Sequence, residues 1–201
     1  MNTDGTVGAT ALFVEVLVIG IGVLACLLAI LLAVVGKDLI GLLSSLDGPI
    51  VLVSALSLSY ALGIIVDRLA DRLFQKRATQ LQERSFANDV EYEKARAAVL
   101  RVPAFSARLD YSRSRLRVVR GWSLNGLGLL VSGNLLLIVR YDAPANRVVT
   151  ASLALTVVTL AVSIGSLFAW QSLAETQYQQ IAKQGEMLAS HGEAAPTSAQ
   201  V

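Results

Sequence analysis

Four long apolar stretches constrain what this chain can fold into. They cover residues 11–35, 50–66, 122–139 and 148–170, and they contain 25, 17, 18 and 23 residues. A helix needs about 17–25 mostly apolar residues to cross the hydrocarbon core of a bilayer. All four stretches fit this range. The sequence therefore predicts an all-α membrane protein with four transmembrane helices.

The charge content and the N-terminus agree with this prediction. Only 16% of the 201 residues are charged and 54% are hydrophobic, whereas about 25% of the residues of a soluble domain are charged. A cleaved signal peptide has a basic n-region and an apolar core of about 7–15 residues. Residues 1–10 contain no Lys or Arg, and the first apolar stretch is longer than such a core. We therefore interpret this stretch as a retained transmembrane helix.

The basic residues are concentrated in one connecting segment. Of the 17 Lys and Arg residues, 13 lie in residues 67–121. Because basic loops stay in the cytoplasm, this segment is predicted to be cytoplasmic, and an even number of spans places both termini there as well. Trp122 and Trp170 fall at the predicted cytoplasmic interface, which indole rings favour. From the small size and short spans we expect a protein of the bacterial inner (plasma) membrane.

This topology divides the chain into four segments. Residues 1–66 form an N-terminal transmembrane hairpin, 67–121 a basic helical hairpin in the cytoplasm, 122–170 a C-terminal transmembrane hairpin and 171–201 a tail. Residues 67–100 lack Pro and Gly, which favours one helix running out of the second span. Pro103 ends that helix, and a second helix leads into the third span. We expect the fourth span to continue as a polar helix over 171–189, with disorder from about residue 191.

Five hydroxylated residues share one face of the fourth stretch. They are spaced 4, 3, 4 and 3 residues apart and are Ser152, Thr156, Thr159, Ser163 and Ser166; we call them the polar face. Small hydroxylated side chains let helices approach closely and hydrogen-bond across the contact. The polar face, with Asn134 in the third stretch, is therefore either a packing surface, the commoner case, or the lining of a pore between subunits. The other stretches also carry faces of small residues, and this surplus predicts a homo-oligomer.

Two sets of charged residues are further candidates. Glu15 is the only acidic residue well inside an apolar stretch, and an ionisable residue there is a functional candidate by default. It either pairs with Arg68 or Arg120 or handles ions or protons. A juxtamembrane basic cluster, expected to attract anionic lipid headgroups at about 1 kcal/mol per basic residue, consists of Arg113, Arg115, Arg117 and Arg120.

The sequence offers little for catalysis. It contains no P-loop, HExxH, GxSxG or GxGxxG motif, and its only cysteine and only histidine are Cys26 and His191. We expect no enzymatic activity, cofactor or metal, and we do not expect nucleic-acid binding, since no recognisable module is present. The first hypothesis is a small multi-pass protein that self-associates, as an ion-permeable pore or a membrane-disrupting effector. The alternative is a non-conducting membrane anchor or adaptor that recruits a soluble partner through residues 67–121.

Overall fold

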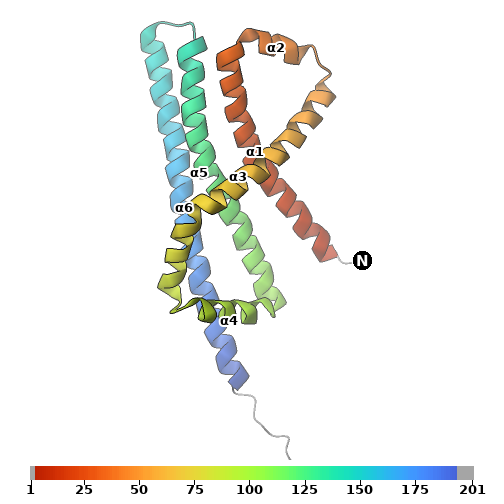
Figure 1. Ribbon diagram of the computed structural model, residues 1–201, viewed down its shortest axis with the longest axis vertical. Helices are drawn as coiled ribbons and strands as arrows, with labels where there is room; N and C mark the ends of the chain where they lie inside the picture. Colours follow the sequence, from red (N-terminus) through yellow and green to blue (C-terminus); the bar gives the residue numbers. More distant parts are fainter. Residues whose placement is uncertain (1–2, 194–201) are drawn as a thin grey trace, which may run out of the picture. The chain divides into compact units, whose positions relative to one another are not determined.

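The computed structural model describes residues 3–193, and all six elements within them are α-helices (Figure 1). The helices are α1 (Thr3–Val35), α2 (Lys37–Ser44), α3 (Gly48–Ser85), α4 (Asp89–Leu100), α5 (Pro103–Arg140) and α6 (Ala145–Glu193). Four of them, α1, α3, α5 and α6, are long and apolar enough to cross a membrane. The all-α class and the four candidate membrane-spanning helices are thus confirmed.

Three of these helices are much longer than the predicted spans. Helices α3 and α5 have 38 residues each and α6 has 49. At 1.5 Å per residue they are about 57 Å and 74 Å long, roughly twice the hydrocarbon thickness of a bilayer. Pro49 and Pro103 lie in the first turns of α3 and α5, where the missing N–H removes no helical hydrogen bond.

The connecting segment differs from the prediction. One helix was expected over residues 67–100, but α3 ends at Ser85 and α4 begins at Asp89. Between them, Asn88 Oδ1 accepts a hydrogen bond from the Glu91 backbone N–H (2.8 Å), and Glu91 Oε2 accepts one from the Ala87 N–H (2.9 Å). This is a variant of the capping box in which the Glu91 carboxylate accepts from the N–H one residue before the N-cap Asn88, and it starts a new helix. Residues 67–121 therefore hold three helical parts rather than two: the end of α3, α4 and the start of α5.

Two other connections also differ from expectation. The link between the first two spans was expected to be a loop, but it contains α2, which follows Gly36 (φ 82°). Helix α6 continues through His191 to Glu193, although disorder was predicted from about residue 191. The remainder of the predicted disordered tail, 194–201, lies outside the described residues.

The chain divides into two compact units. Unit 1 contains residues up to Arg72 together with Arg117–Ala169. Within it α1 and α3 cross in backbone contact: a Cβ atom on Gly20 would lie 1.6 Å from the Ser59 carbonyl oxygen, and one on Gly63 would lie 2.0 Å from the Val16 carbonyl oxygen. Only glycine fits at such a crossing. From there α1 and α3 diverge towards α2 (Figure 1).

Helix α5 holds α1 at two further levels of unit 1. Asn125 Nδ2 donates a hydrogen bond of 2.8 Å to the Ile19 carbonyl oxygen. At the other end, the Arg140 guanidinium donates to the carbonyl oxygens of Ala33 (2.9 Å) and Val34 (2.6 Å). Because the last carbonyls of a helix lack partners within it, Arg140 acts as a C-terminal cap of α1.

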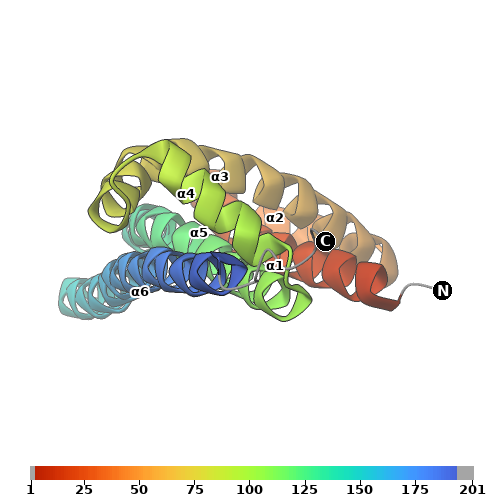
Figure 2. The same ribbon diagram turned by 90° about the horizontal axis from the view of Figure 1, so that it is seen from below.

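Unit 2 contains Leu73–Leu116 and the chain from Trp170 onward. Its buried core consists of Phe86, Val99, Leu109 and Ile181, so α4, α5, α6 and the residue that follows α3 contribute. Helix α4 joins the end of α3 to the start of α5 and lies across the C-terminal half of α6 (Figure 2). Tail residues that were expected to form only a polar helix are therefore part of this core.

Trp170 also lies in unit 2. Its ring packs edge-on against Phe74 with 4.8 Å between ring centroids, and only 3% of the residue is exposed. Packing between helices therefore accounts for the burial of this ring, and its place at the membrane interface stays a prediction.

Candidate interaction groove and polar helix contacts

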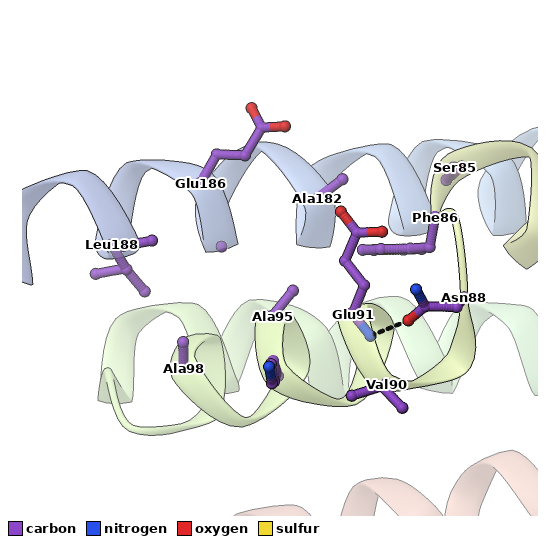
Figure 3. Close-up of a pocket in the computed structure, with 13 residues that line it drawn as sticks. Ser85, Phe86, Asn88, Val90, Glu91, Ala95, Ala98, Ala182, Glu186 and Leu188 are labelled. Carbon is purple, nitrogen blue, oxygen red and sulfur yellow. Dashed lines mark hydrogen bonds between the residues drawn. The ribbon is translucent and has the colours of Figure 1, made fainter.

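A groove of about 810 Å³ lies within unit 2, between α4 and the C-terminal half of α6 (Figure 3). We refer to it as the α4–α6 groove. Its lining residues come from the end of α3, from α4 and from α6, and they are Ser85, Phe86, Asn88, Val90, Glu91, Lys94, Ala95, Ala98, Ala182, Gly185, Glu186, Leu188 and Ala189.

Small residues line the part of the groove where the two helices meet. A Cβ atom on Gly185 would lie 2.7 Å from the Ala95 Cβ atom, so α4 and α6 touch at this point. Larger apolar side chains lie at the two ends, Phe86 near the start of α4 and Leu188 towards the end of α6 (Figure 3). The groove is thus shallow and apolar along its middle.

Charged side chains of both signs border the groove. Glu91 is engaged in the capping box of α4, whereas Lys94 and Glu186 form no ion pair with another described residue. The Glu186 side chain points away from α4 (Figure 3). These two side chains are exposed and can contact a molecule that lies over the groove.

The polar face of α6 joins α5 within unit 1. Ser152 Oγ donates to Asn134 Oδ1, and Asn134 Nδ2 donates to Thr156 Oγ1 (3.2 Å). Further along, Ser163 Oγ donates to the Ser123 carbonyl oxygen (2.7 Å). The two helices run side by side over this region (Figure 1).

The other two hydroxyls of the polar face do not reach α5. Thr159, only 5% exposed, donates to the Leu155 carbonyl oxygen of its own helix (2.8 Å), and Ser166 is half-buried. Three of the five side chains thus bond to α5 and a fourth to the α6 backbone. Such contacts are those expected where membrane helices pack closely.

The small-residue faces of the other spans are also used inside unit 1. Ser59 and Ser132 are each 1% exposed. A Cβ atom on Gly22 would lie 2.2 Å from Asn125 Nδ2, and one on Gly128 would lie 2.9 Å from Cys26 Sγ. Contacts within one chain therefore use small-residue faces from which self-association was predicted.

The four arginines of the predicted basic cluster make different contacts within the chain. Arg120 pairs with Asp67 (3.0 Å) and Asp71 (2.5 Å) of α3, and the side chains of Arg120 and Asp67 are each only 13% exposed. The two aspartates lie four residues apart on one face of α3, so both carboxylates can reach the same guanidinium. Arg113 pairs with Asp110 (3.5 Å), Arg115 lies over the Tyr111 ring (5.6 Å), and Arg117 is half-buried.

Glu15 is not paired as the sequence suggested. It is 9% exposed, and its Oε2 atom has no hydrogen-bond partner among the described residues. Both expected partners are engaged elsewhere: Arg120 as above, and Arg68 with Asp71 (3.8 Å). No group of three metal-ligating side chains that could hold an ion occurs in residues 3–193.

Comparison with known proteins gives no relative for this chain. No protein-family model, curated protein or solved structure matches it.

The polar contacts of unit 1 and the α4–α6 groove of unit 2 differ in what they can do chemically. The polar contacts of unit 1 satisfy hydroxyl and amide groups within the bundle, and this holds its helices together. The α4–α6 groove instead presents unfilled apolar surface beside charges of both signs, which is the composition of a binding surface.

Proposed function

We propose that this protein is a non-conducting membrane anchor that recruits a soluble partner through the α4–α6 groove. The observation that carries the proposal is that unit 2 has a buried core of its own and bears the groove. Helices that only cross a bilayer need about 20 residues. The additional turns of α3, α5 and α6 instead build unit 2.

The distribution of basic residues supports a cytoplasmic location for unit 2. Residues 67–121, which supply most of it, hold 13 of the 17 Lys and Arg residues. An excess of basic residues near the ends of spans keeps a segment in the cytoplasm. The final part of α6 belongs to the same unit, so the C-terminus would lie on the same side, in a bacterial inner membrane.

The chemistry of the groove suggests an amphipathic helix as the partner's binding element. Large apolar side chains at helical spacing fill a groove whose middle is formed by small residues. Lys94 and Glu186 beside the groove favour a partner that carries both signs of charge. Ion pairs between these two exposed side chains and the partner would contribute to specificity more than to affinity.

The pore hypothesis, which the sequence placed first, needs the polar face to contact water. Three of its hydroxyls bond to α5 and a fourth to the α6 backbone. A pore would have to replace these bonds or add water to them. This use of the polar face supports the anchor over the pore.

Two measurements on the full chain test the proposal. Reconstituted in liposomes, the protein should pass no ions at any protein-to-lipid ratio. Held in nanodiscs, it should capture a specific protein from bacterial cytosol, and Ala98→Arg should abolish the capture because Ala98 lines the groove. Ala107→Arg places the same charge on exposed α5 surface of unit 2 and should leave the capture unchanged. Stepwise ion conductance, or equal capture by both variants, would contradict the proposal.

A further inference from the structure

Helix α2 exposes an apolar surface that the anchor function does not explain. None of its residues is buried. Ile40 and Leu42 are 57% and 61% exposed, and Leu46, just after the helix, is 50% exposed. An isolated helix of eight residues is also too short to be stable in water. No other part of residues 3–193 therefore covers this surface.

The residues of this segment are fully segregated by polarity. At 100° per residue, its large apolar residues fall within an arc of about 160°. The apolar side consists of Leu39, Ile40, Leu42, Leu43 and Leu46, and the opposite side consists of Lys37, Asp38, Gly41, Ser44 and Ser45. The hydroxyls of Ser44 and Ser45 bond back to the Gly41 and Leu42 carbonyl oxygens (2.9 and 2.7 Å).

The chain itself determines what lies next to this surface. A single residue separates the end of α1 from the start of α2, and three residues separate the end of α2 from the start of α3. Both neighbours are candidate membrane-spanning helices. Figure 1 shows α2 lying across the gap between their diverging ends. Such short connections hold α2 at the edge of the bilayer, where the headgroup region meets the acyl chains.

We propose that α2 is an interfacial helix whose apolar side inserts into the bilayer where α1 ends and α3 begins. Amphipathic helices of this kind lie in the plane of the interface, with the apolar side about 5–10 Å into the headgroup–acyl boundary. Lys37 and Asp38 are the only charged residues of α2, and their charges cancel. Insertion should therefore depend on apolar burial and not on anionic lipid.

Site-specific quenching tests this assignment in the full chain. In a Cys26→Ala background, Leu42→Cys and Ser44→Cys each receive an environment-sensitive fluorophore and are reconstituted in phosphatidylcholine vesicles. The two sites lie on the same helix and on opposite sides of it, and neither residue is buried, so the substitutions remove no packing. Vesicle orientation affects both sites equally.

Iodide should quench the label at Leu42→Cys several-fold less than the label at Ser44→Cys. A lipid that carries a quencher near its headgroup should instead quench the label at Leu42→Cys more than the label at Ser44→Cys. Adding anionic lipid or salt should not change this difference in quenching. Equal iodide quenching at the two sites would overturn the proposal. Protection at Leu42→Cys that disappears when lipid dilutes the protein would also overturn it, in favour of a second copy covering α2. Neither outcome depends on whether unit 2 binds a partner.

Discussion

Removing the Arg120 guanidinium should destabilise unit 1 more than removing any other arginine of the predicted cluster. Arg120 bridges α5 to Asp67 and Asp71 of α3. In Arg120→Gln, Asp67 stays in its largely buried position without a counter-charge. Arg117→Gln is the matched control, because it removes the same charge from the same helix and Arg117 pairs with no described acidic residue.

The exposure of each partner sets the magnitude. Breaking a buried ion pair by removing one member costs about 3–5 kcal/mol. Asp71 is 46% exposed, so water can solvate it and its share is at most about 1 kcal/mol. The main cost comes from Asp67, at 13% exposure, and we expect about 3 kcal/mol in total. Adding Asp67→Asn removes the stranded charge, so the double variant should recover most of this loss.

Reversible unfolding of the full chain in mixed micelles of increasing SDS content, followed by helical circular dichroism, measures these differences. Arg117→Gln should stay within about 1 kcal/mol of the unsubstituted protein, because removal of the half-buried Arg117 side chain leaves no partner charge unpaired. The reasoning is refuted if Arg120→Gln and Arg117→Gln lose equal stability. It is also refuted if the double variant is no more stable than Arg120→Gln.

Three further substitutions test the contacts that position the helices. Gly20→Ala should lower unfolding stability in the same assay by about 1–3 kcal/mol, since its Cβ atom would collide with the Ser59 carbonyl, whereas Gly165→Ala, with nothing within 4 Å of its Cβ position, should not destabilise. Arg140→Ala should speed amide hydrogen exchange in the last turn of α1 and cost about 1–2 kcal/mol, while Arg147→Ala, at an exposed position, serves as control. Asn88→Ala should cost about 0.5–2 kcal/mol and raise exchange at the start of α4, with exposed Asn146→Ala showing no such change.

The helix class and the four spans could be predicted because lipid imposes a length and a composition on any segment that crosses it. The break after Ser85 was harder to see. Residues 67–100 lack Pro and Gly, and the capping box at Asn88 and Glu91 was its only local sign. Partners for Arg120 and Glu15 depended on which helices became neighbours, and spacing along one helix does not determine that.

Helix α6 shows why the core of unit 2 was missed. Its hydroxylated positions recur at 4, 3, 4 and 3 residues along the apolar part. The same spacing continues along the polar part in Ala174, Tyr178, Ile181, Gly185 and Leu188, all of which are buried or pack on the core. Among lipid-facing residues, an inward face is marked by small and polar side chains, because apolar ones gain nothing by leaving lipid. Among water-facing residues it is marked by apolar side chains.

One inward-facing stripe on α6 therefore changes its residue class along the helix, which is the change that a passage from lipid to water predicts. The change falls near Trp170, which is buried and follows the last hydroxylated position, Ser166, by four residues. Judged by overall polarity alone, this part of the sequence predicts an apolar span followed by a polar helix. A buried helix face is better recognised by how its residues differ from those on the rest of the same helix segment. By that criterion the apolar residues at helical spacing over 174–188 predict a second buried surface. That surface lies among polar residues, as the proposed membrane anchor requires of a unit that presents a binding groove to water.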